Sequence, residues 1–206
     1  MSADHGRTCC QVSGERDRDK MNQLHDDLRA LRIEVDEELR RRWDRSLPFA
    51  DALFDRWERA DKLGFGEGAS VYDSAHVFGS VTVGRKTWIG PFVVLDGSGA
   101  DLTIGDFCDI SAGVHIYTHD TALRCVSMGE VASRRSPVRI GDGTYIGSQS
   151  VVVAGTRIGS RCIVGANSLV NTDVPERTIV AGSPAVPIGR VEGYGADVHC
   201  VFSTDN

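Results

Sequence analysis

An aliphatic residue recurs at every sixth position along much of the chain, and each is followed four places later by a residue that is not large. A short fixed period of this kind is typical of a solenoid, in which each repeat is too small to bury its own apolar face and must stack on the next. The hexads open at Val71, Val77, Val83, Ile89 and Leu95, after a three-residue slip at Ile104, Ile110 and Ile116, and again at Ile140, Ile146, Val152, Ile158, Val164 and Val170.

Six residues suit one short strand and one corner. The branched first residue favours extended backbone and points inward, and glycines such as Gly84 and Gly147, placed directly after it, permit the tight turn. Three such sides make a coil of about eighteen residues, so the chain should form about five coils at the spacing of neighbouring strands, about 4.8 Å. A β-sandwich is the alternative, but it would show strict alternation with turns every 8–12 residues. We therefore predict a parallel β-helix over residues 64–190.

A helical pattern precedes the repeats. Apolar residues at three- and four-residue spacing predict one amphipathic helix, and they are Leu24, Leu28, Leu31, Val35, Leu39 and Trp43. Ser46 has the character of a cap for a second helix, with Pro48 in its first turn. Residues 21–63 are thus predicted to form two helices that cover the open end of the solenoid, where strand edges would otherwise lie unpaired, or a neighbouring subunit.

The two ends carry weaker patterns. Residues 1–20 are polar and charged with almost no large aliphatic residues, which predicts a disordered tail. Residues 191–206 form a C-terminal tail that is too short and irregular for a prediction. Between them, the repeat is interrupted at residues 117–139, and this segment is predicted to leave the solenoid as a loop.

Composition narrows the classes of function. The 206 residues are 41% hydrophobic and 25% charged, as in an ordinary globular protein, and the net charge of −6 argues against a nucleic-acid partner. No apolar run approaches the roughly 18 residues that span a bilayer, and the N-terminus lacks the apolar core of a signal peptide. We therefore expect no membrane insertion.

The cysteines form no paired metal motif. There are six of them, and two, Cys108 and Cys162, occupy small inward positions of the repeat. We interpret these two as core residues, and free cysteines favour a reducing cytoplasm.

His119 is the candidate for chemistry. It lies in Tyr117-Thr118-His119-Asp120, at the base of the predicted loop. Functional residues are often placed on loops held by a rigid scaffold, and a histidine is suited to general-base catalysis at neutral pH.

The hexads, together with the segment from Ile110 to Asp120 and with Pro137-Val138-Arg139-Ile140-Gly141, resemble the hexapeptide-repeat acyltransferases. The likeness is to the sugar acetyltransferase branch, which includes galactoside and maltose acetyltransferases and relatives in surface-polysaccharide synthesis. It covers about residues 64–190. It implies a left-handed coil, a homotrimer with active sites between subunits, and acetyl-CoA as co-substrate. It also implies that His119 deprotonates the acceptor, which then attacks the thioester carbonyl directly.

Neighbouring polar residues receive roles from the same resemblance. Asp120 is assigned to orient His119, although an aspartate after a histidine often turns the chain. Asp96 lies near a family aspartate that contacts the acceptor, and a turn role competes with that assignment. His115 is interpreted as a surface residue.

The resemblance also implies a donor side. Tyr145-Ile146-Gly147-Ser148 is similar to a family segment in which a backbone amide at Gly147 or Ser148 stabilises the thioester oxygen. For coenzyme A, the candidates are Ala166, Thr172 and Pro184, the last in a closing Gly-x-Pro-Ala segment. The family usually has Lys or Arg next, where this chain has Val186, and Arg190 is the substitute considered for the 3′-phosphate.

Two other functions were weighed. The γ-class carbonic anhydrases bind zinc through three histidines on a similar solenoid, and His76, His115 and His119 are the residues to compare. That family keeps four residues between its last two histidines, whereas three separate them here, so no metal is expected. A non-catalytic scaffold is the other alternative. We predict an acetyl-CoA-dependent transfer to a hydroxyl or amine of a sugar, either a nucleotide sugar or a surface-polysaccharide unit.

Overall fold

The computed structural model describes residues 8–203, and the chain divides into two compact units, Met1–Leu53 and Phe54–Asn206. The first unit contains helices α1 (Thr8–Trp43) and α2 (Phe49–Leu53). Helix α1 includes the predicted amphipathic stretch but begins further upstream, so residues 8–20 are helical rather than disordered. Glu, Arg, Lys and Gln residues in this segment favour helix, so its polar composition did not imply disorder. Residues 1–7 lie outside the described part.

The N-terminal segment holds three helices instead of the predicted two. Ser46 is not a helix cap, because its hydroxyl donates to Asp36 of α1 at 2.9 Å. Instead, Asp55 caps helix α3 (Arg56–Lys62) by accepting the N–H groups of its first turn. Helix α3 belongs to the second unit, where Ala60 and Phe65 join the solenoid core. It therefore covers the first coil.

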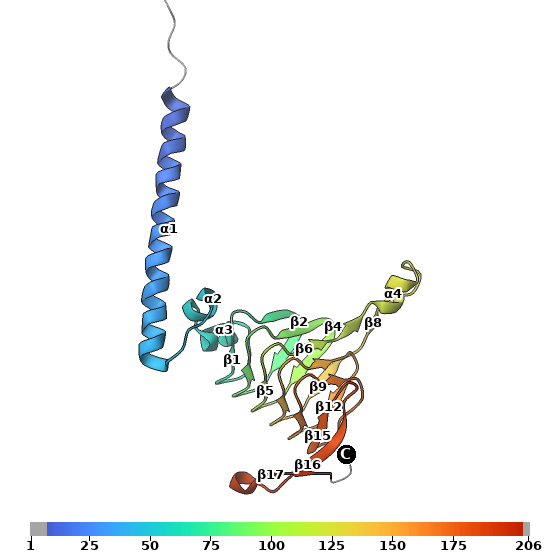
Figure 1. The fold of residues 1–206 in the computed structure, drawn as a ribbon. Helices are drawn as coiled ribbons and strands as arrows, with labels where there is room; N and C mark the ends of the chain where they lie inside the picture. Colours follow the sequence, from blue (N-terminus) through green and yellow to red (C-terminus); the bar gives the residue numbers. More distant parts are fainter. Residues whose placement is uncertain (1–7, 204–206) are drawn as a thin grey trace, which may run out of the picture. The chain divides into compact units, whose positions relative to one another are not determined.

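The second unit is a three-sided stack of parallel strands, which Figure 1 shows from β1 to β15. On the first face, each strand pairs in parallel with the next coil, in register. These strands are β1 (Ser70–Val71), β3 (Trp88–Ile89), β5 (Asp109–Ile110), β10 (Tyr145–Ile146), β13 (Ile163–Val164) and β15 (Thr178–Ala181).

The second and third faces join at a corner that two long strands, β2 (His76–Val83) and β4 (Val94–Ile104), run through. Later coils have separate short strands on these faces. The second face continues with β6 (His115–Tyr117), β11 (Val151–Val152) and β14 (Leu169–Val170), and the third with β9 (Val138–Ile140), β12 (Arg157–Ile158) and a bridge from Ile158 to Val174. The predicted β-helix, with five coils complete on all three faces, is thus what the chain forms.

The core consists of the residues that open the hexads. All of them except Val77, which is partly buried, are at most 3% exposed. They stack in one column per face, as in Val71, Ile89, Ile110, Ile146, Val164 and Val180 on the first face. The sequence period is therefore confirmed as the packing period.

The three-residue slip in the period is a bulge in β4. The register of β2 and β4 shifts between Gly79, opposite Gly97, and Val81, opposite Leu102. Two residues on β2 thus span five on β4, and the extra residues lie within residues 98–101. Bulges of this kind re-aim side chains and often lie next to functional sites.

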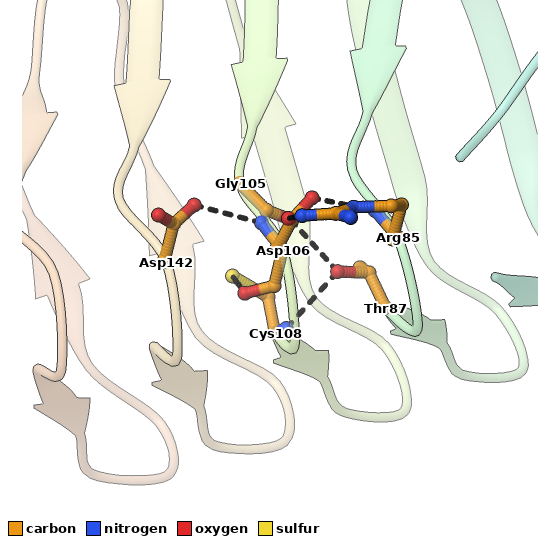
Figure 2. Close-up of polar contacts among 6 residues, drawn as sticks. All are labelled: Arg85, Thr87, Gly105, Asp106, Cys108 and Asp142. Carbon is orange, nitrogen blue, oxygen red and sulfur yellow. Dashed lines mark hydrogen bonds and ion pairs between the residues drawn. The ribbon is translucent and has the colours of Figure 1, made fainter. Parts of the chain in front are cut away.

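Side chains at one corner tie successive coils together (Figure 2). Asp106 accepts the backbone N–H of Arg85 at 2.7 Å and pairs with its guanidinium at 2.6 Å. Asp142 repeats the backbone contact one coil later, accepting the N–H of Asp106 at 2.8 Å. Inside the same corner, Thr87 donates to the carbonyl of Gly105, and Cys108 lies close to the carbonyl of Gly141. The small inward residues therefore satisfy backbone groups that the corner leaves unpaired.

The Arg85–Asp106 contact makes stability depend on pH. Hydrogen bonds from the Arg85 side chain, then from its backbone, lower the pKa of Asp106 below its usual value. A lowered folded-state pKa means that this stabilisation is present above about pH 4 and is lost as the pH falls through the folded pKa. In Asp106→Asn we expect a lower Tm near neutral pH and a smaller further loss on acidification. Thermal melts across this pH range should leave Asp109→Asn, an exposed aspartate of β5, with the wild-type slope. Equal slopes for Asp106→Asn and wild type would contradict this prediction.

Cys108 and Cys162 are buried core residues, as predicted, and burial raises the pKa of both thiols. A raised thiol pKa leaves little thiolate at neutral pH, so these cysteines are chemically inert.

The loop and the C-terminal segment complete the second unit. The loop leaves the column through the antiparallel pair β7 (His119–Asp120) and β8 (Arg134–Arg135) and carries α4 (Ala122–Val126), which projects from the coils in Figure 1. The tail is more regular than expected: β16 (Val186–Glu192) and β17 (His199–Phe202), separated by the 3-10 turn η1 (Gly195–Asp197), pair antiparallel onto β15 and close the last coil. Across residues 8–203, no helix has the length and apolar character to cross a membrane.

Candidate functional site

His119 lies at the corner between the second and third faces, where the chain leaves β6 for the loop. Its side chain is 31% exposed, whereas its Nδ1 atom is buried and has no hydrogen bond. Nδ1 is 3.5 Å from Oδ2 of Asp96, an ion-pair distance that is longer than a hydrogen bond. The exposed part of the ring is therefore the edge that carries Nε2, which is the edge that can meet a substrate.

Asp96 lies on β4, one coil before His119, and is 8% exposed. Its Oδ1 atom accepts the N–H and the hydroxyl of Ser98, at 2.9 and 2.5 Å. The turn role considered for this residue is therefore present, and it leaves Oδ2 facing the imidazole. Contact between Asp96 and an acceptor stays a prediction.

Thr118 holds the two coils together beside the histidine. Its fully buried hydroxyl donates to the carbonyl of Asp96 at 2.7 Å and accepts the N–H groups of Gly99 and Ala100 at 3.2 and 3.1 Å. Both donors belong to the β4 bulge. The three-residue slip in the repeat thus supplies the two N–H groups that bond Thr118, the residue directly before His119.

Asp120 does not orient the imidazole. Its carboxylate is exposed and accepts the N–H of Ala122 at 2.7 Å, which closes the turn before α4. Short polar side chains commonly make this local contact. The carboxylate beside Nδ1 is that of Asp96, which approaches from the neighbouring coil, so adjacency in sequence was misleading.

The other histidines of the rejected zinc site are engaged elsewhere. His115 contacts the Tyr117 hydroxyl at 3.1 Å through Nδ1, and His76 stacks on Phe78. Within the described range, no three His, Cys, Asp or Glu side chains are arranged to hold a metal ion.

Gly147 and Ser148 lie at a different corner, between the first and second faces. The Gly147 N–H donates to the carbonyl of Val164 at 2.8 Å, so it is not available to a thioester oxygen. A β-carbon on Gly147 would lie 2.6 Å from the backbone nitrogen of Ala166, which explains the glycine as a corner residue. The Ser148 N–H donates to no acceptor in the described part of the chain. Of the two predicted amides, only that of Ser148 is free to bind an oxyanion.

The predicted coenzyme residues fall at three different edges. Ala166 is stacked on Gly147 and Ser148, and Pro184 lies at the same corner in the last coil. Thr172 follows β14 and lies at the corner of His119. Arg190 lies at the other end of β16, opposite Thr178, about 13 Å along the strand from Val186. It is therefore too distant to replace the basic residue missing at Val186.

Two groups of site residues emerge. His119, Asp96 and Thr172 are at one edge of the second face, and Ser148, Ala166 and Pro184 are at the opposite edge, with β11 and β14 between them. One chain does not bring its free amide and its imidazole together.

Some residues of the site escaped sequence analysis. Thr118 directly precedes His119, and a β-carbon on Gly99 would lie 2.5 Å from the His119 β-carbon. The available signal was the three-residue slip itself, which was recognised but not connected with His119. Arg134 and Arg139, in the loop base and on the third face, have no predicted role. For Arg157, the sequence left open a contribution of positive potential toward coenzyme A or an ordinary surface position.

The fold and this corner site define the chain as a hexapeptide-repeat β-helix protein. Residues 137–172 match the family described as bacterial transferase hexapeptide (six repeats). Among solved structures, the chain is similar to a hexapeptide-repeat acetyltransferase of Vibrio cholerae O1 biovar eltor, complexed with acetyl coenzyme A. The identity is 29%, the TM-score is 0.60, and the match covers 84% of this chain and 90% of that one.

Curated relatives agree with this assignment. The chain is 33% identical over 94 residues to the galactoside O-acetyltransferase of Lactococcus lactis, covering 42% of this chain and 45% of that protein. It is 30% identical over 123 residues to an Escherichia coli K12 O-acetyl transferase named for lipopolysaccharide biosynthesis, covering 59% and 57%. The chain spans about half the length of these curated relatives. It is similar to hexapeptide-repeat acetyltransferases over this shared part.

Proposed function

We propose that this protein is an acetyl-CoA-dependent acyltransferase that moves an acetyl group to a hydroxyl or amine of a sugar, with His119 as general base. The observation that carries the proposal is a partly exposed imidazole whose Nδ1 is buried beside Asp96 at the root of a protruding loop. The acetyl-CoA complex of the Vibrio cholerae relative supports the donor. The galactoside and lipopolysaccharide relatives support a sugar acceptor, such as a nucleotide sugar or a surface-polysaccharide unit.

The chemistry follows from the two ends of the imidazole. Nε2 takes the proton from the acceptor hydroxyl or amine while that oxygen or nitrogen bonds to the thioester carbonyl carbon. The tetrahedral intermediate then expels the coenzyme A thiolate, which takes up the proton held on His119. The Asp96 carboxylate faces the opposite edge of the ring, with its Oδ2 3.5 Å from Nδ1.

The thioester oxygen gains negative charge during this attack. We propose that the Ser148 N–H stabilises it, since that amide lies at a corner and has no acceptor among residues 8–203. A fixed backbone donor of this kind is worth about 3 kcal/mol in the transition state.

The separation of the two groups supports a site formed between copies of the chain. His119 and Ser148 lie at opposite edges of the second face, so one copy's imidazole can meet the Ser148 corner of its neighbour. Side-by-side packing around a threefold axis satisfies every site in this way, which is the homotrimer that the family resemblance implies. The left-handed sense of the coil belongs to the same proposal.

Asp96→Asn tests the positioning of the base. The amide keeps the shape of the side chain but removes the charge beside Nδ1. We expect kcat to fall about a hundredfold, because small losses of alignment are costly, while KM for acetyl-CoA stays within about twofold. Steady-state kinetics at saturating acceptor would check this. A rise in KM with unchanged kcat would instead assign Asp96 to substrate binding.

The function as a whole is tested by release of free coenzyme A. Acetyl-CoA would be incubated with the protein and a panel of amino sugars, sugar nucleotides and oligosaccharides, with thiol detected by a chromogenic disulfide and the product by mass. Acceptor-dependent thiol with a product heavier by one acetyl group is the expected result. Failure to bind acetyl-CoA, measured by calorimetry, would refute the proposal whichever acceptors were tried.

A further inference from the structure

A cavity of about 180 Å³ opens on the third face beside the loop. It is lined by Ser136, Pro137, Arg139, Gly155, Thr156 and Arg157. This volume is well above the roughly 10–15 Å³ of cavity space that one water molecule needs, so it has room for a phosphate group.

The lining is cationic, although the chain carries a net charge of −6. Arg139 and Arg157 are register partners on β9 and β12, so both guanidinium groups leave the same face on neighbouring coils. A third, Arg134, places a terminal nitrogen 3.3 Å from where a β-carbon on Gly155 would stand. None of the three pairs with a carboxylate of the described residues.

Two smaller features favour an anion in this place. The Ser136 hydroxyl would lie 3.0 Å from the same β-carbon, so the glycine keeps open the space between Ser136 and Arg134. Two carboxylates lie nearby and offset part of the charge: Asp173 accepts the backbone N–H of Arg157 at 2.8 Å, and Asp120 is the strand partner of Arg134. Convergent guanidinium groups and a hydroxyl are the usual partners of phosphate oxygens.

The cavity lies close to His119. The Ser136 N–H donates to the carbonyl of Thr118 at 3.0 Å, and Arg135 is the strand partner of His119. Val152 on β11 is the register partner of Ile116 on β6. Gly155 lies three residues after Val152, and His119 lies three residues after Ile116. Gly155 is therefore one coil beyond His119, at the same corner. One coil is about 4.8 Å.

The short distance between the cavity and His119 indicates which of the two substrates would place a phosphate there. In acetyl-CoA the reacting thioester is separated from the diphosphate by the whole pantetheine arm with its two amide units. In a sugar phosphate or a nucleotide-diphosphate sugar, the phosphate is attached to the ring that carries the accepting group. An anion site one coil from the base therefore matches the acceptor better than the donor.

We propose that the cavity between Ser136, Arg139 and Arg157 binds a phosphate group of the acceptor, so that the acceptor is a nucleotide-diphosphate sugar or another phosphorylated sugar. This inference rests on the proposed acyltransferase function and specifies its substrate class. Arg139 and Arg157 hold the phosphate oxygens, and the sugar extends from there toward Nε2 of His119.

Calorimetric titration of the full chain tests the inference without turnover. The probes are inorganic pyrophosphate and UDP for the acceptor, and coenzyme A and its 3′-dephospho form for the donor. We expect Arg139→Ala and Arg157→Ala to weaken pyrophosphate and UDP about tenfold or more, because charge-assisted hydrogen bonds are lost. Coenzyme A affinity should change by less than about twofold. Arg139→Lys should show an intermediate loss, since it keeps charge but not the planar fork. Arg32→Ala, an exposed arginine of α1, is the matched control for loss of one positive charge.

The outcomes separate the phosphate-site proposal from the acyltransferase proposal on which it rests. No binding of pyrophosphate or UDP by the wild type, or equal binding by the arginine variants, would overturn the phosphate site. A loss of coenzyme A affinity in those variants that the dephospho form does not share would assign the cavity to the donor's 3′-phosphate and also overturn it. Neither result touches the acyltransferase proposal, which stands or fails with acetyl-CoA binding and thiol release by the wild type.

Discussion

Replacing His119 with alanine is expected to reduce acyl transfer by about 10² to 10⁴-fold, the usual contribution of a positioned general base. The imidazole is the group whose exposed edge can take the acceptor's proton, and the carboxylate beside its Nδ1, that of Asp96, is a poor replacement because it is 8% exposed and bonded to Ser98. Coenzyme A affinity should stay nearly unchanged. The measurements are thiol release at saturating substrates and calorimetric titration of coenzyme A.

His76→Ala is the matched control, since His76 lies on β2, stacked on Phe78 at the opposite edge of the second face from His119. It should keep near-wild-type turnover and a similar Tm. Unchanged turnover in His119→Ala would eliminate the general-base mechanism, and equal losses in both variants would point to unfolding.

Gly99→Ala is expected to damage the site through backbone crowding. The added β-carbon would lie 2.5 Å from the His119 β-carbon and 2.7 Å from the Thr118 carbonyl oxygen. Both contacts are too short, so His119 must move. We expect about 1–3 kcal/mol of lost stability and a kcat about a hundredfold lower, because misplacement of a catalytic group by about 1 Å has that effect.

Gly159→Ala separates crowding from displacement of the base. Its β-carbon would lie 2.5 Å from the nitrogen and 2.7 Å from the α-carbon of Glu176, at the corner between the third and first faces, away from both His119 and Ser148. Chemical denaturation should show a comparable loss of stability, while kinetics at a temperature where both variants are folded should show a far smaller loss of kcat. Equal kcat values for the two variants would contradict a specific role for Gly99.

The solenoid was predictable because its period is the packing period. Residues such as Ile110 and Val164 open hexads and are fully buried, since each face of a coil is one strand long. Regularity of this kind is absent from the ends. Residues 8–20 are helical despite their polarity, and the tail forms β16 and β17 because the last coil presents a strand edge that no sequence period announces.

The site was predictable only in part. His119 was found because it interrupts the repeat, but its carboxylate partner was assigned to the adjacent residue. Contacts between coils join residues about twenty positions apart, such as Asp96 and His119, and no local spacing indicates them. The free amide was also not predictable from local sequence, because Gly147 and Ser148 are neighbours in the chain. Only the pairing with the next coil shows that the Gly147 N–H is already bonded to the carbonyl of Val164.

The bulge at residues 98–101 makes one coil of the β-helix different from the others. Among the coils of residues 71–175, it is the one place where β4 carries three more residues than its neighbour, and the buried Thr118 hydroxyl is bonded to it. The coils after Val152 keep the register of their neighbours and carry no comparable insertion. Building the proposed site on another coil would require transplanting the insertion and the threonine together with the histidine, so the position of His119 depends on two consecutive coils and not on one residue.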